Sequence, residues 1–214
     1  FILFLFKPFY RLALSNLYRQ AHKEHVVTAQ LKVLQQSSFN EPDLIDSAQK
    51  GDKVAFKQLY QLHHKRVYAL CFRITGQVAL AEDATQDCFV TLWQKLPQFR
   101  GESQFTTWLH SLCVNQALSS VKKHRSFWSR FVSSDIDVHS VSDEYEDLDK
   151  ILLKLPERAR IVFVLHALEG YKHEEVALLM GIATGTSKAQ YHRAQKLLEA
   201  IIDKEPTDTG GHND

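Results

Sequence analysis

The last helical stretch of the sequence carries side chains that can bind nucleic acid. Lysine and arginine neutralise phosphates or read guanine, and glutamine can form two hydrogen bonds to adenine. Helical spacing predicts an inward face of Ala194, Leu197 and Leu198. A solvated amphipathic helix would look similar, so this helix alone leaves DNA binding open. The expected exposed face comprises Thr186, Lys188, Gln190, Tyr191, His192 and Arg193.

A second group of side chains could bind unpaired bases. Aromatic faces beside cations are suited to stacking on single-stranded nucleic acid. The alternative is that Phe105 and Trp108 belong to a hydrophobic core, and for Trp108 the core is at least as good an explanation. The group consists of Phe99, Phe105 and Trp108 with Arg100, Lys122 and Lys123.

No arrangement typical of an enzyme or a metal site is found in the sequence. Asp83 and Asp87 lie four residues apart and could share a magnesium ion, but no third ligand is in view. The 11 histidines have no repeated ligand spacing. There is no nucleophile with a paired base and no phosphate-binding glycine loop. We therefore expect no catalytic residues, no metal, no cofactor and no small-molecule substrate.

The composition is that of a soluble globular protein. Of 214 residues, 44% are hydrophobic and 24% are charged, and the formal net charge is +1. Cys71, Cys88 and Cys113 have no CxxC pairing, which suits a reducing cytoplasm; we expect Cys71 and Cys88 to be buried and none to sense redox state. The apolar N-terminal run is interrupted by Lys7 and Pro8 and is too short to cross a bilayer, so we expect no membrane insertion.

Apolar residues recur at helical spacing from residue 43 onward. The spacing predicts a helix over 43–50, a long helix between an Asp52 N-cap and a stop at Gly76, and a third helix over 78–95. A fourth helix, capped by Ser103, should continue towards residue 121.

Helical spacing resumes after an acidic, serine-rich stretch. The predicted helices cover 156–168, 172–180 and 184–203, with Thr184 as a possible N-cap of the last one. A short helix, a turn containing Gly181 and a longer helix form the pattern of a helix-turn-helix, whose second helix enters the major groove.

The sequence thus predicts an all-α fold: two small helical domains joined by a flexible linker, the second containing the helix-turn-helix. We expect residues 1–40 to be an unassigned extension, part of it an upstream reading-frame or cloning artefact, because the only methionine is Met180. The other predicted segments are a first domain (41–122), the linker (123–147), a second domain (148–204) and a disordered tail (205–214).

Two blocks of sequence, in order, resemble conserved regions of bacterial sigma factors. The runs AEDATQDCFV (81–90), LPQFRG (96–101) and FTTWL (105–109), closed by Val114 and Asn115, resemble region 2. The runs LPERAR (155–160), EGY (169–171), EEVA (174–177) and GTSK (185–188) resemble region 4. With no domain between them, the layout is similar to that of the extracytoplasmic-function group. The resemblance implies a subunit that directs RNA polymerase to promoters and is not an enzyme.

The resemblance also implies roles for individual residues. The recognition helix departs from the family pattern at Ser187, Ala189 and Gln190, which leaves the minus-35 sequence open. A stand-alone helix-turn-helix regulator is the alternative function. Implied polymerase-binding residues are Glu82, Asp83, Gln86 and Asp87; implied minus-10 residues are Phe99, Arg100, Gly101, Asn115, Ser119, Lys122 and Lys123; implied minus-35 residues are Thr186, Lys188, Gln190, His192 and Arg193.

The implied partners are RNA polymerase core, through its clamp and flap, promoter DNA and an anti-sigma factor. The acids of the linker would thread towards the RNA exit path. The implied location is the cytoplasm, with the anti-sigma factor as a means of holding the chain at the membrane.

Overall fold

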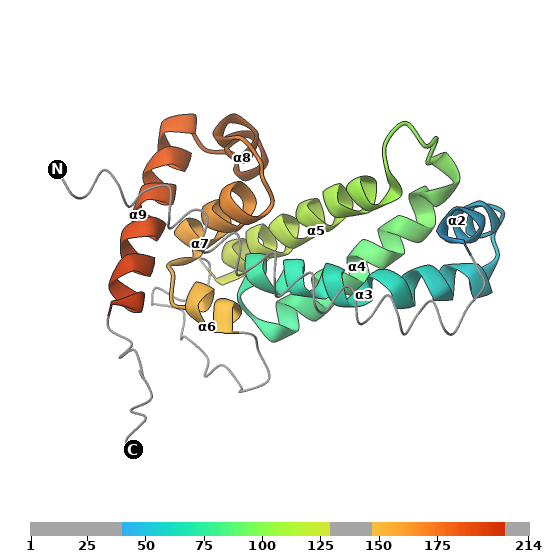
Figure 1. Ribbon diagram of the computed structural model, residues 1–214, viewed down its shortest axis with the longest axis horizontal. Coiled ribbons are helices and arrows are strands. Elements are labelled where there is room, and N and C mark those ends of the chain that lie inside the picture. Colours follow the sequence, from blue (N-terminus) through green and yellow to red (C-terminus); the bar gives the residue numbers. More distant parts are fainter. Residues whose placement is uncertain (1–39, 129–146, 204–214) are drawn as a thin grey trace, which may run out of the picture.

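The computed structural model describes residues 40–128 and 147–203 (Figure 1). The predicted N-terminal extension, the tail and most of the predicted linker lie outside the described residues. Within them every regular element is a helix, as the sequence predicted. The first domain contains α2 (Glu41–Gln49), α3 (Lys53–Thr75), α4 (Val78–Lys95), η2 (Leu96–Gln98) and α5 (Phe105–Trp128). The second contains α6 (Asp147–Leu153), α7 (Glu157–Phe163), η3 (Val164–Leu168), α8 (His173–Met180) and α9 (Thr184–Ile202).

Local signals in the sequence set several helix ends. The Asp52 carboxylate accepts hydrogen bonds from the amides of Val54 (2.7 Å) and Ala55 (3.3 Å), which caps the start of α3. Gly76 ends α3 with φ of 72°, a left-handed conformation that favours glycine. The bounds of α4 are those predicted.

Several predicted helix ends differ from the structure, most by one or two residues. Ser103 does not cap α5, because the first helical hydrogen bonds run from Thr107 and Trp108 to the carbonyl of Gln104. Thr184 is the first residue of α9 rather than its N-cap, a position that Ala183 occupies without a side-chain bond. Helix α5 continues to Trp128, because basic side chains in its last turns interact favourably with the negative end of the helix dipole.

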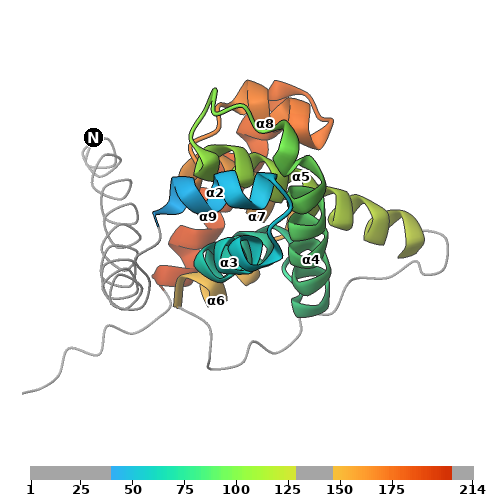
Figure 2. The same cartoon turned by 90° about the vertical axis from the view of Figure 1, so that its right-hand side faces the viewer.

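The first domain is a bundle in which α3, α4 and α5 pack against one another, with α2 across one end (Figures 1 and 2). Its core includes Leu59 and Leu92, both fully buried. All three cysteines are buried there, as expected for Cys71 and Cys88, and the Sγ atoms of Cys71 and Cys113 lie 3.5 Å apart. The neighbouring Cys71 thiol, then Cys88 and burial, raise the pKa of Cys113 well above its usual range.

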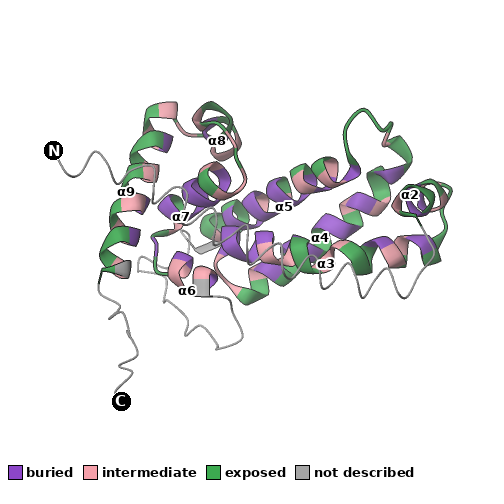
Figure 3. Cartoon of the chain, viewed as in Figure 1, coloured by how far each residue is buried: buried purple, intermediate pink, exposed green. Residues whose placement is uncertain are grey.

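The second domain packs α7 and α8 against α9, and it also touches the first domain. Helix α7 contacts α3, and α8 contacts α5. Buried side chains from both domains join in one apolar cluster, which includes Ile74 of α3 and Ile161 of α7. Figure 3 shows buried positions on the facing sides of these helices. In the described residues the two domains are therefore closed on each other.

Candidate nucleic-acid interface

An aromatic group lies where η2, the following loop and the start of α5 meet. The ring centroids of Phe99 and Trp108 are 4.9 Å apart, and those of Phe99 and Phe105 are 5.7 Å apart, edge to face. Phe105 is buried and so belongs to the core, whereas Phe99 and Trp108 are half-buried. The structure thus brings the predicted aromatic residues together and leaves two of them partly accessible for stacking.

The loop after η2 is held from one side and open on the other. The side-chain amide of Gln49 donates hydrogen bonds to the carbonyls of Phe99 (2.7 Å) and Leu96 (3.1 Å), which ties α2 to the loop. Sequence reasoning did not identify Gln49, because nothing in the sequence pairs it with residues about fifty positions away. Arg100 and Gly101 are exposed, so the loop presents a cation to solvent.

Predicted minus-10 residues also line one stripe of α5. Asn115, Ser119 and Lys122 are spaced at i, i+4 and i+7, which places them on one helix face. Asn115 is exposed and donates from Nδ2 to the carbonyl of Ser111 at 2.9 Å. Ser119 is half-buried, and Lys122 and Lys123 are exposed. Lys122 Nζ also donates to the Leu179 carbonyl of the second domain, at 3.1 Å.

One face of α4 is acidic and fully open. Its opposite face carries Ala81, Ala84 and Cys88 in the core. One turn further along the open face, Val90 is 55% exposed, an apolar side chain that sequence reasoning did not identify as part of this surface. All four predicted polymerase-binding residues are exposed on this face: Glu82, Asp83, Gln86 and Asp87.

Helices α8 and α9 form the helix-turn-helix. Gly181 takes φ of 68° in the turn, and the amides of Gly181 and Ile182 close it on the end of α8. His173 Nδ1 and Ser187 Oγ, 3.0 Å apart, join the two helices. Burial, then the neighbouring His166 and Lys188, lower the pKa of His173.

The exposed face of α9 is narrower than the sequence predicted. Lys188, His192 and Arg193 are exposed, and Thr186 is half-buried. Tyr191 was expected on this face, but its ring packs inward against Phe163 (centroids 6.0 Å) because an aromatic ring can fill the gap between α7 and α9. The Oε1 atom of Gln190 is also buried and has no hydrogen-bond partner among the described residues.

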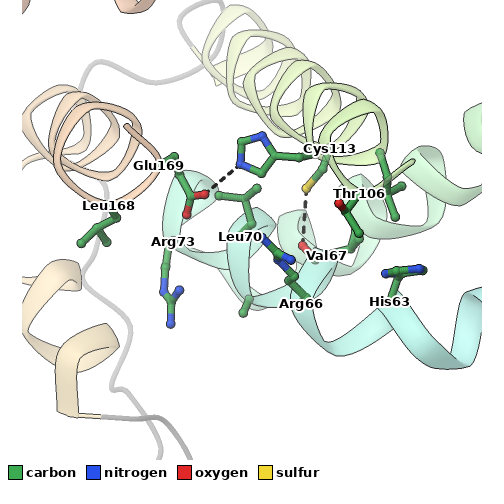
Figure 4. A pocket seen from close by; sticks show the side chains of 12 residues that line it. His63, Arg66, Val67, Leu70, Arg73, Thr106, Cys113, Leu168 and Glu169 are labelled. Atoms are coloured by element: carbon green, nitrogen blue, oxygen red, sulfur yellow. Dashed lines mark hydrogen bonds and ion pairs between the residues drawn. The ribbon is translucent and has the colours of Figure 1, made fainter. Parts of the chain in front are cut away.

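A cavity of about 140 Å³ lies between the two domains, over α3 and α5 and against the segment that carries Leu168 and Glu169 (Figure 4). His110 Nε2 and Glu169 Oε2 are 2.8 Å apart across it. Arg66, Arg73 and His63 also line it. Among the described residues no group of histidine, cysteine or acidic side chains could hold a metal ion. No described helix is long and apolar enough to span a membrane.

The described residues form a two-domain helical protein whose second domain contains a helix-turn-helix, a class of fold that is typical of DNA-binding proteins. Residues 59–127 match the family model of sigma-70 region 2, and residues 145–198 match that of sigma-70 region 4; together they cover more than half of the chain. The chain therefore belongs to the sigma-70 family, in its group of extracytoplasmic-function (ECF) RNA polymerase sigma factors. As a sigma factor it directs RNA polymerase to promoters. The family is one of transcription-initiation factors rather than of known enzymes.

Curated relatives match this chain over most of their own length. The chain is 26% identical over 172 residues to the ECF sigma factor SigW of Bacillus subtilis, covering 72% of this chain and 92% of SigW. It is 29% identical over 179 residues to the ECF sigma-E factor of Escherichia coli, covering 73% of this chain and 91% of that protein. Because both conserved regions match, a stand-alone helix-turn-helix regulator is not favoured.

Two solved structures are also similar. RpoE of Bartonella quintana, solved with the anti-sigma factor NepR, has a TM-score of 0.49 at 24% identity; the match covers 70% of this chain and 98% of RpoE. CnrH, solved with the cytosolic domain of CnrY, has a TM-score of 0.45 at 24% identity; the match covers 76% of this chain and 96% of CnrH.

Proposed function

We propose that the chain binds the clamp of RNA polymerase core through the acidic face of α4. Glu82, Asp83, Gln86 and Asp87 are exposed on one face, while the opposite face of the same helix is held in the core. Carboxylates and an amide are suited to a basic helical partner, and charge complementarity speeds association and fixes orientation. The apolar Leu178 on α8, 85% exposed, is our candidate for contact with the polymerase flap.

Charge reversal on α4 tests the clamp contact. Asp83→Lys with Asp87→Lys should weaken binding of fluorescent full-length protein to core polymerase by about tenfold or more, because like charges would then face each other. The matched control is Asp43→Lys with Asp46→Lys, two exposed acids on α2. An equal loss of affinity for core polymerase in both double variants would show that α4 is not part of the interface.

The minus-10 element is assigned to the aromatic loop and the stripe of α5. A flipped base could stack on the half-buried Phe99 and bond to Asn115, while Arg100, Lys122 and Lys123 hold phosphates. Unstacking a base costs a few kcal/mol, which stacking and amide hydrogen bonds can offset.

Asn115→Ala tests base recognition, with Ser111→Ala as its control on the same exposed face. If the Asn115 amide reads the base, affinity of the holoenzyme for fork DNA should fall roughly tenfold to a hundredfold, and discrimination at one base should relax. Ser111→Ala should leave both unchanged. A uniform loss at all sequences would instead indicate a phosphate contact.

The minus-35 element is assigned to the exposed face of α9. Lys188, His192 and Arg193 are all free to approach a major groove, and Thr186 lies near the helix start. With its amide oxygen buried, Gln190 contributes less than the sequence alone suggested. Arg193→Ala should make the free energy of duplex binding less favourable by about 1–3 kcal/mol. Arg158→Ala, which changes an exposed residue of α7, should leave it unchanged.

We propose the cytoplasm as the site of action and an anti-sigma factor as a further partner, with the linker acids lying along the RNA exit path. The segments 41–122, 123–147 and 148–204 would then act as polymerase- and minus-10-binding domain, linker and minus-35-binding domain. Addition of a partner of this class should suppress run-off transcription by holoenzyme. A candidate that binds the chain without suppressing transcription would not fill this role.

A further inference from the structure

The end of α3 in the first domain is occupied by an arginine of the second. Arg160 of α7 is only 7% exposed, and its Nε donates to the carbonyl of Arg73 at 3.1 Å. Its Nη2 donates to the carbonyls of Thr75 (3.1 Å) and Ile74 (3.5 Å). These carbonyls lie at the negative end of the helix dipole, where a cation is stabilised. Arg160 therefore caps a helix of the other domain.

A buried ion pair joins the domains beside this cap. Arg73 Nε and Asp149 Oδ1 are 2.6 Å apart, and the two side chains are 5% and 9% exposed. Asp149 lies on α6, so α6 and α7 both attach to the last turns of α3. Buried charges are costly unless paired, and this pair takes one residue from each domain.

The closed arrangement also engages basic side chains of α5. Lys122 bonds to the Leu179 carbonyl at the end of α8, and Arg125 pairs with Glu157 at the start of α7. Lys122 is among the residues assigned above to the DNA backbone, and Arg125 lies one turn further along the same helix. Closure of the two domains thus engages Lys122, a cation that is also proposed to hold DNA, and the neighbouring Arg125.

We propose that Arg73, Asp149 and Arg160 form a latch that holds the free chain closed, and that the latch must open for DNA binding. In the open state the three charges are exposed to water. Substituting one of them therefore leaves an uncompensated buried charge in the closed state only, and so destabilises the closed state more than the open one. The link to DNA rests on the proposed function of α5, whereas closure itself does not.

The test uses the full chain with two latch variants, Asp149→Ala and Arg160→Met, and with Arg158→Met as the matched control. Arg158 lies on the same helix as Arg160 but is exposed. Small-angle X-ray scattering reports closure, and circular dichroism confirms that helix content is retained. If Arg160→Met unfolds the second domain, Asp149→Ala, whose site is on the separate helix α6, carries the test.

The second measurement is binding of a fluorescent single-stranded oligonucleotide of random sequence at low salt, which reports the free cations of α5. Removing one partner of a buried ion pair should shift the equilibrium between closed and open states towards the open state by about a hundredfold or more. Because the apparent affinity rises with the open fraction, oligonucleotide binding should tighten by up to about that factor. The control should scatter and bind as the wild type does.

Each outcome separates the two claims. A wild-type chain as extended as the variants, or variants as compact as the wild type, overturns the latch. Variants that extend without gaining affinity overturn the competition with DNA. If no form of the protein binds the oligonucleotide although the variants extend, the latch stands and the proposed DNA contacts of α5 fail.

Discussion

Substitution of Gly76 by alanine should damage the protein far more than the same change at Gly51. Both glycines have positive φ, 72° and 92°, so alanine is strained at either position by about 1 kcal/mol. A Cβ at Gly51 would meet nothing within 4 Å, whereas one at Gly76 would lie 2.3 Å from Nη2 of Arg160. The difference between the two variants therefore isolates the contact with Arg160.

The size of that difference follows from the hydrogen bonds that Arg160 would lose. To clear the new methyl group, the guanidinium must leave carbonyls that it bonds at 3.1 Å, those of Arg73 and Thr75. Two bonds from a charged donor are worth about 3 kcal/mol or more. We expect Gly76→Ala to lower the free energy of unfolding by about 4 kcal/mol and Gly51→Ala by about 1 kcal/mol.

Urea unfolding followed by circular dichroism measures both values. In an Arg160→Ala background the clash is gone, so Gly76→Ala should cost no more than Gly51→Ala does, a non-additivity typical of contacting residues. Equal losses for the two glycine variants in the wild-type background would refute the contact between Gly76 and Arg160.

Three further predictions concern the first domain. Asp52→Ala removes the cap of α3 and should lower the free energy of unfolding by about 1 kcal/mol, whereas Asp46→Ala on the exposed side of α2 should not. A hydrogen bond from His63 lowers the pKa of Glu41 below its ordinary 4.5, so the pair stabilises the fold above that pH and the contribution is lost as pH falls through the lowered pKa. Urea midpoints of Glu41→Gln should therefore fall less than those of the wild type on acidification, and an equal fall would contradict the pairing. Cys71, Cys88 and Cys113 are all buried, so a thiol reagent should label none of them rapidly in the native chain and all three in urea; rapid native labelling would reopen a redox role.

Local chemistry made much of the fold predictable. Asp52 caps the start of α3 through its side chain, whereas Gly76 and Pro97 mark helix ends through their backbone preferences, and α4 has the predicted bounds. The longer course of α5 was missed because the polar run at residues 122–126 interrupts the apolar periodicity. Their basic side chains suit a helix end, which the hydrophobic pattern does not register.

Contacts between the domains could not be predicted, because they join residues far apart in the sequence. Arg73 and Asp149 are 76 positions apart, and each looks like an ordinary surface charge on its own helix. Tyr191 was misassigned for a related reason: an amphipathic pattern does not show which polar aromatic ring fills a gap between two helices. The four residues of α4 that the resemblance implied as polymerase-binding are all exposed, on the face opposite the buried side of the helix.

Run-off transcription with purified bacterial core polymerase and genomic promoter fragments tests the sigma-factor function most directly. Core polymerase alone should not initiate at these promoters, the wild-type protein should confer initiation, and Arg193→Ala should weaken it. No initiation with the wild-type protein, combined with tight binding of duplex DNA by the protein alone, would contradict the account and point to a stand-alone regulator.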